Sequence, residues 1–370
     1  MRKPGPRLGI AAKIRITTKI KIATKIITRA TITTKITHIP RPVRHQPVAG
    51  LSMEATAAHG DRRSAKATSR PDTEPPLSQG VRTMSTATVH DPQDSTTWHD
   101  HIKTYGYVII HNVVPQENLD AVLNDLWAHT GASPDDRDSW YQPEIIRPGG
   151  MVEMYHYQSM WNNRQNERLY EIFRAIHGTD RLSVSIDRVG FKPPVDPAHP
   201  EYNHKGMIHW DADMESFPDI PFHVQGVLAL TDTEPDMGGF QCIPETYQDL
   251  ENFLKTQTPE QIASRNPDYT GYSITHPRLA AGDLIVWTNM LLHGNGHNTS
   301  GKPRFAQYIS MNPATNDPEA TRRRVDIWQR NTHPAGKAFP GDPRGIEEAR
   351  PEPAHLTELG RKLLGVDPWE

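Results

Sequence analysis

Helical periodicity is confined to a few stretches of the chain, each with its own start and stop signals. Between Pro115 and Gly131, the apolar residues Leu119, Val122 and Leu126 recur at helical spacing. A proline before the first turn and a glycine after the last are typical helix boundaries, so this stretch predicts one amphipathic helix. Comparable patterns predict helices over residues 95–106, 166–178, 246–266 and 355–365.

From about residue 183 the pattern changes to short β-like runs. These runs are rich in Val, Ile, Phe and Tyr, and Pro, Gly, Asn and Asp separate them. Together with one earlier run at 105–114, the predicted strands fall within residues 182–192, 206–213, 222–232, 238–244, 272–279, 283–289 and 303–311. Many short strands with turn residues between them predict a mainly β sandwich or barrel with flanking helices.

The N-terminal region has a different character from the rest of the chain. Residues 1–50 contain 12 Lys and Arg side chains and no Asp or Glu, in a biased Ile-Thr-Lys tract. We predict that residues 1–92 are a disordered extension and linker, and that residues 93–370 form the folded domain with its C-terminal extension. A mitochondrial transit peptide is the alternative for the basic tract. A translation start at Met53 or Met84 would remove the tract altogether.

Charge and cysteine content narrow the classes of partner. Beyond residue 50 the chain holds 29 basic and 44 acidic side chains, a net charge of −15, which disfavours non-specific nucleic-acid binding. No apolar run is long enough to predict a membrane span. The single cysteine, Cys242, fits a reducing compartment, and no catalytic motif surrounds it. We therefore expect a cytoplasmic protein that acts on a small molecule.

The triplet His209-Trp210-Asp211 is the first half of a candidate metal site. On a strand, residues two apart point to the same face, with Cβ atoms about 6.5 Å apart. One metal ion can bridge an imidazole and a carboxylate at that spacing. Asp213 would share the face but lies one pleat further on. Alone, the triplet also fits a surface strand whose His and Asp face water.

The second half of the site lies in residues 280–311. His293 follows the apolar run 289–292, and Arg304 opens a predicted strand 11 residues later. A second distant His would complete a two-His, one-carboxylate triad, which suits Fe(II) because coordination positions stay open for O2 and a chelating co-substrate. The planar guanidinium of Arg304 matches the far carboxylate of 2-oxoglutarate, which a Lys cannot bind bidentately.

In these segments the chain resembles the phytanoyl-CoA dioxygenase family of Fe(II)- and 2-oxoglutarate-dependent oxygenases. The resemblance covers roughly residues 97–312. It rests on the segment YGYVIIHNVVPQENLDAV, the HWD triplet, the segment TEPDMGGFQCIPETY and, most specifically, GDLIVWTNMLLHGNGHNTSGKPRFAQY. It implies a double-stranded β-helix, the cupin-like jelly roll, which agrees with the many short strands.

The resemblance also implies roles for individual residues. His209, Asp211 and His293 match the iron ligands, Arg304 matches the 2-oxoglutarate anchor, and Asn295 falls where the family often has a small polar residue near the co-substrate. The implied reaction hydroxylates or otherwise oxidises a small molecule with Fe(II), 2-oxoglutarate and O2, and releases succinate and CO2.

The chain departs from the family at two places. Glu245 and Thr246 replace the usual Gly-Ser-His ending after the proline, which affects the expected substrate contacts and not the metal site. His297 stands where proline is more usual and competes as the third ligand. We prefer His293, because it directly follows an apolar run, whereas His297 follows a Gly-rich bend.

Three other functions use the same architecture. A non-redox cupin-like metalloprotein, such as an isomerase or a binding module, has no need for a carboxylate anchor at Arg304. A halogenase frees a position for halide by losing the triad carboxylate, whereas Asp211 is present. A catalytically inactive binding protein is disfavoured by the intact triad.

The pattern of the N-terminal region leads to a first prediction. Deletion of residues 1–83 should leave melting temperature, solubility and activity nearly unchanged, because this region has no core-forming pattern. Thermal unfolding of the full-length and truncated proteins measures the effect, and a large drop on truncation would contradict it. Transport of a reporter into mitochondria by residues 1–52 would instead support the transit peptide.

Overall fold

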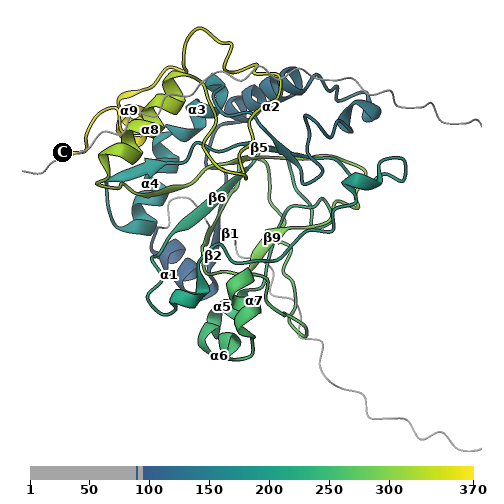
Figure 1. Cartoon of the computed structure of the whole chain (residues 1–370), viewed down its shortest axis with the longest axis vertical. Coiled ribbons are helices and arrows are strands. Elements are labelled where there is room, and N and C mark those ends of the chain that lie inside the picture. Colours follow the sequence, from purple (N-terminus) through teal and green to yellow (C-terminus); the bar gives the residue numbers. More distant parts are fainter. Residues whose placement is uncertain (1–88, 91–94) are drawn as a thin grey trace, which may run out of the picture. The chain divides into compact units, whose positions relative to one another are not determined.

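Seven strands form the largest sheet of the protein (Figure 1). The computed structural model describes residues 89–90 and 95–370, so the expectations for residues 1–88 and 91–94 lie outside the described residues. In spatial order the strands are β1 (Val89–His90), β2 (Tyr107–Ile110), β8 (Leu284–Thr288), β6 (Val224–Ala229), β10 (Arg304–Tyr308), β5 (Val189–Lys192) and β3 (Met151–Val152). Apart from the parallel β1–β2 pair, neighbouring strands are antiparallel.

A smaller β layer packs on one face of this sheet. Its centre is the antiparallel pair β7 (Phe240–Cys242) and β9 (His293–Asn295). Single bridges extend it, with His209 pairing beside β9 and Thr275 pairing beside β7. The pair β4 (Leu182–Val184) and β11 (Met311–Pro313) forms a separate two-stranded sheet. Two facing antiparallel layers give the jelly roll that the sequence predicts, and this fold class is confirmed.

Strand β8, in the middle of the large sheet, is buried on both faces. On β8, Leu284 and Val286 belong to the core beneath the helices, whereas Ile285 and Trp287 point toward the small layer. This explains why the segment is continuously apolar and does not alternate with polar residues. Phe240 of β7 meets Trp287 with ring centroids 4.8 Å apart, so side chains of both layers fill the space between them.

The helices surround the two layers without entering them. They are α1 (Ser95–Tyr105), α2 (Gln116–Thr130), α3 (Gln158–Arg164), α4 (Glu167–His177), α5 (Pro244–Gln248), α6 (Leu250–Lys255), α7 (Pro259–Ser264), α8 (Pro318–Gln329) and α9 (Glu358–Leu364). Short 3₁₀ turns occupy Arg137–Trp140, Pro200–Tyr202 and Met214–Ser216. In Figure 1, α5, α6 and α7 gather beyond β9 at one end, and α8 and α9 lie near the C-terminus.

The predicted helix boundaries agree well with the structure where capping residues mark them. Helix α4 begins at Asn166, whose side chain accepts the N–H groups of Arg168 and Leu169, and ends at Gly178 with φ 66°. Gly131, with φ 70°, ends α2 in the same way. The prediction of one helical insertion over 246–266 is correct in helix content, but the region forms three short helices, α5 to α7, and not one continuous helix.

Two of the predicted strands are also wrong. Residues 206–213 form no strand: their one β-bridge is at His209, Gly206 has φ 87°, and Asp213 already caps a 3₁₀ turn. Residues 272–279 pair only through Thr275 and Leu279. Both segments are held by isolated backbone bridges and not by a continuous strand pairing.

No helix in the described part of the chain is long and apolar enough to cross a lipid bilayer.

The C-terminal segment is fastened to the core by a buried carboxylate. Glu347 is 4% exposed, and its two carboxylate oxygens accept the backbone N–H groups of Tyr155 (2.6 Å) and His156 (2.5 Å). Arg164, also buried, donates to the carbonyl of Tyr155. The turn after β3 is thereby tied to residues almost 200 positions later in the chain.

Glu347→Ala should lower the free energy of unfolding by about 2–6 kcal/mol, because two buried N–H groups lose their acceptors. Urea unfolding of wild type and variant measures the change. The exposed neighbour provides a matched control, and Glu348→Ala should change stability by less than about 0.5 kcal/mol. Equal stability of the two variants would show that the contact does not hold the segment.

Candidate metal centre

His209 and His293 face each other across a backbone bridge. The N–H of His209 donates to the carbonyl of His293 (2.9 Å), and the N–H of His293 donates to the carbonyl of His209 (3.1 Å). Directly paired residues of antiparallel chains place their side chains on the same face. The two imidazole rings accordingly lie with centroids 4.8 Å apart.

Two glycines allow these chains to approach. A Cβ atom on Gly294 would lie 1.7 Å from the carbonyl oxygen of Met207, and one on Gly206 would lie 2.0 Å from the carbonyl oxygen of Asn295. Gly206 also has φ 87°, a conformation that side chains rarely adopt. The glycines on either side of the bridge are therefore required for the His209–His293 pairing.

Alternation along the extended segment brings Asp211 to the same side as His209. Ile208, Trp210 and Ala212 are buried against α6, in a core that includes Leu250 and Phe253. The intervening His209 and Asp211 consequently point the other way, toward His293. The predicted same-face geometry is present although the segment is not a regular strand.

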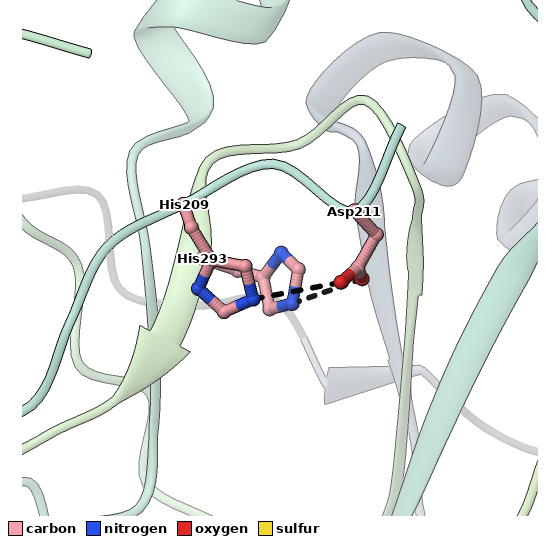
Figure 2. Close-up of side chains that lie close together, drawn as sticks. All are labelled: His209, Asp211 and His293. Carbon is pink, nitrogen blue, oxygen red and sulfur yellow. Dashed lines mark ion pairs between the residues drawn. The ribbon is translucent and has the colours of Figure 1, made fainter. Parts of the chain in front are cut away.

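The carboxylate of Asp211 faces both imidazoles from one side (Figure 2). Its Oδ1 is 3.5 Å from Nε2 of His209, and its Oδ2 is 3.2 Å from Nε2 of His293. Gln225 of β6 donates from Nε2 to Oδ2 at 2.6 Å, and Arg265 donates to the Asp211 carbonyl. Burial raises the pKa of Asp211, but the hydrogen bonds from the two histidines outweigh it and hold the pKa well below its usual value.

His293 is the most constrained of the three residues. Its side chain is 6% exposed, compared with 31% for His209 and 25% for Asp211. Its Nδ1 lies 2.9 Å from the carbonyl of Leu291, and its ring packs against those of Trp287 and Phe240. The carbonyl contact occupies Nδ1, so Nε2, which faces Asp211, is the ring nitrogen available to a metal ion.

These three side chains meet the geometric requirement for binding one metal ion. One donor atom from each of His209, Asp211 and His293 lies within 4.8 Å of the others. The Nδ1 atom of His209 is buried and has no hydrogen-bond partner among the described residues. Two imidazole nitrogens and one carboxylate oxygen form the donor set typical of non-haem Fe(II) sites.

The two competing ligand candidates have other contacts. The Nε2 atom of His297 pairs with Oδ1 of Asn203 at 2.8 Å, and the cluster of candidate metal ligands contains His293 instead. Asp213 is exposed, and its side chain accepts the N–H of Glu215 at the start of a 3₁₀ turn. Cys242 is buried opposite His293 on β7, and burial raises the pKa of its thiol, so it is a core residue and not an exposed nucleophile.

Arg304 opens β10 and is only 2% exposed. On that strand Ala306 and Tyr308 belong to the interior between the layers, and Phe305 faces the helices, so Arg304 points into the interior. Asn295 donates from Nδ2 to the Tyr308 hydroxyl at 3.1 Å, which links β9 to the same interior. No carboxylate of the described residues lies within 4.0 Å of the Arg304 guanidinium.

Two further polar residues, Lys192 and Gln225, belong to this interior. Lys192 is 2% exposed and lies directly opposite Arg304 on β5. No sequence motif marks Gln225. It lies two residues before Val227 and four before Ala229 on β6, and this period-two spacing indicates that it faces the same interior.

A surface cavity of about 530 Å³ lies in another part of the protein. Residues 179–183, 313–321 and 362–369 contribute its lining, and none of the three candidate ligands does.

Comparison with known proteins agrees with this architecture. Residues 102–306, more than half of the chain, match the family described as phytanoyl-CoA dioxygenase (PhyH). A Dictyostelium discoideum protein named after phytanoyl-CoA dioxygenase is 21% identical over 263 residues, covering 59% of this chain and 75% of the relative. The Ava biosynthesis cluster protein O of Aspergillus versicolor is 24% identical over 244 residues, covering 58% and 77%.

A solved structure shares the fold at low sequence identity. The GlcNAc Inducible Gene 2 protein of Candida albicans superimposes with a TM-score of 0.58 and 14% identity, over 77% of this chain and 80% of that one. The match over residues 102–306 includes His209, Asp211, His293 and Arg304. The chain belongs to the phytanoyl-CoA dioxygenase family.

Proposed function

We propose that the protein is an Fe(II)- and 2-oxoglutarate-dependent dioxygenase that hydroxylates, or otherwise oxidises, a small molecule. The observation that carries the proposal is the convergence of His209, Asp211 and His293, whose donor atoms lie within 4.8 Å of one another. Arg304 supports it, because this buried residue has no acidic partner among the described residues, and a non-redox metal site has no use for a carboxylate anchor there.

The positions of the three side chains suit a bound Fe(II) ion, and so do the charge of Asp211 and the ring orientation of His293. Asp211 is held as a carboxylate by its low pKa, and Gln225 fixes the orientation of its Oδ2. The contact of Nδ1 with the carbonyl of Leu291 leaves Nε2 of His293 available to a metal ion. A bound Fe(II) ion would supply the oxidation chemistry, in which O2 and 2-oxoglutarate are consumed and succinate and CO2 are released.

The protein's own contribution is to orient the co-substrate and to limit access of water. A buried guanidinium without an acidic partner is costly, and the far carboxylate of 2-oxoglutarate would neutralise Arg304 and fill its fork of donors. Trp287 and Phe240 pack around His293, so the inner side of the centre is apolar. His209 and Asp211 remain partly exposed, which leaves one side open to the substrate.

A small molecule is the substrate class that the chain supports. The acidic charge of the sequence beyond residue 50 opposes binding to nucleic acids. The relative from Aspergillus versicolor is named for a biosynthesis cluster, which agrees with a role in the modification of a metabolite. A halogenase remains disfavoured, because Asp211 occupies the position that such an enzyme leaves vacant for halide.

Asp211→Ala should reduce Fe(II) affinity by more than about 100-fold, since loss of an outer-shell partner alone costs 10- to 100-fold and this residue is a proposed ligand. Calorimetric titration with Fe(II) under nitrogen measures the affinity, and 2-oxoglutarate consumption should be lost in parallel.

The nearby Asp213→Ala serves as the matched control, because Asp213 is exposed and only caps a 3₁₀ turn. It should bind Fe(II) as the wild type does. If Asp211→Ala bound Fe(II) normally, or if both variants lost the metal equally, the assignment of Asp211 would be wrong.

Arg304→Lys should weaken 2-oxoglutarate binding by roughly 10- to 150-fold, because a single point charge replaces a bidentate fork. Fe(II) affinity measured without 2-oxoglutarate should hardly change. Equilibrium titration of the metal-loaded protein gives both values. The exposed Arg278 pairs with Glu234, and Arg278→Lys is the control that should behave as wild type. Unaltered 2-oxoglutarate affinity in Arg304→Lys would favour the non-redox metalloprotein.

A further inference from the structure

Lys192 lies beside Arg304 in the interior between the two β layers. The two residues are direct partners in the antiparallel pairing of β5 with β10, so their side chains share a face. Both are 2% exposed. Gly190, two residues before Lys192, belongs to the same face, and a Cβ atom there would lie 3.3 Å from Nη1 of Arg304.

The ammonium group of Lys192 has more donors than the protein satisfies. Its Nζ donates to the carbonyl of Gly296 at 2.5 Å, and the described residues give it no second hydrogen bond. A lysine ammonium carries three N–H donors, so two remain available. No carboxylate of the described residues lies within 4.0 Å of Nζ. Burial, followed by the charge of Arg304, lowers the pKa of Lys192 to about 8.

Two adjacent buried cations without an acidic partner are unfavourable unless an anion joins them. Each charge loses hydration, and the two also repel each other. Both side chains are nevertheless largely buried, and the backbone around the lysine is tight: a Cβ on Gly150 would lie 2.8 Å from the Cβ of Lys192, and one on Gly238 would lie 3.0 Å from its Cδ. Glycine at these positions leaves the room that the lysine stem occupies.

We infer that Lys192 is a second binding residue for the co-substrate, and that it holds the far carboxylate of 2-oxoglutarate together with Arg304. This inference rests on the proposed function. A carboxylate has two oxygens with about four acceptor positions, enough for the Arg304 fork and one lysine N–H. Lys192 keeps its bond to Gly296 while it binds the anion.

Together, Lys192 and Arg304 would select the co-substrate by its far carboxylate. A 2-oxo acid without the far carboxylate leaves both cations unpaired, so the pocket should discriminate strongly against it. This separates the binding role from a purely structural one, in which Lys192 would only hold the loop at Gly296. The structural role affects every 2-oxo acid equally, whereas the binding role affects only those with the second carboxylate.

The test is a two-by-two comparison of lysine variant and ligand. Calorimetric titration of the Mn(II)-loaded protein measures the affinities for 2-oxoglutarate and for 2-oxobutyrate, which lacks the far carboxylate. Lys192→Met should weaken 2-oxoglutarate by roughly 10- to 100-fold and leave 2-oxobutyrate within about twofold of wild type. Circular dichroism and thermal unfolding check that the variant folds. If it does not fold, Lys192→Gln, which retains a donor for Gly296 without the charge, takes its place.

Lys205→Met is the matched control. Lys205 is exposed and lies one residue before Gly206, so its replacement changes the net charge equally near the site. It should leave both affinities unchanged. Equal weakening of both ligands by the Lys192 variant, or wild-type affinity for 2-oxoglutarate, overturns the inference while the proposed function stands. If the wild-type protein does not bind 2-oxoglutarate at all, the proposed function itself fails.

Discussion

The backbone bridge between His209 and His293 is the interaction on which the candidate centre depends. It joins two segments more than 80 positions apart in the sequence and fixes which faces of each point inward. Because the bridge needs Gly206 and Gly294, a substitution at either glycine would displace both histidines without touching a ligand. The metal donors are thus positioned by backbone contacts, and Asp211 follows through the alternation of the extended chain.

The fold class and the candidate residues could be predicted because their signals are local. The helix ends at Gly131 and Gly178 follow from capping chemistry, and the spacing between His293 and Arg304 reflects one bend and one strand start. The environment of Lys192 could not be predicted in this way. Its burial arises from the pairing of β5 with β10, whose residues lie more than 100 positions apart, and a lysine on a strand is usually solvated.

Polar and apolar requirements are separated on the two faces of β10. Phe305 contributes to the core beneath the helices, where ring contacts with Trp127 and Phe191 hold the sheet in place. The opposite face carries Arg304 and Tyr308 toward the interior of the jelly roll. A single strand therefore supplies both stability and a buried charge.

The segment after Pro244 shows why the metal centre is independent of the departures from the family pattern. Glu245 and Thr246 start helix α5, where the Thr246 hydroxyl donates to the carbonyl of Ile243 and is buried. A Cβ on Gly106, which has φ 79°, would lie 2.9 Å from the Tyr247 ring, so α5 is packed tightly against the start of β2. These residues close the end of the jelly roll and supply none of the donors to the metal centre. Their divergence therefore leaves the contacts of Asp211 in the candidate metal centre unchanged.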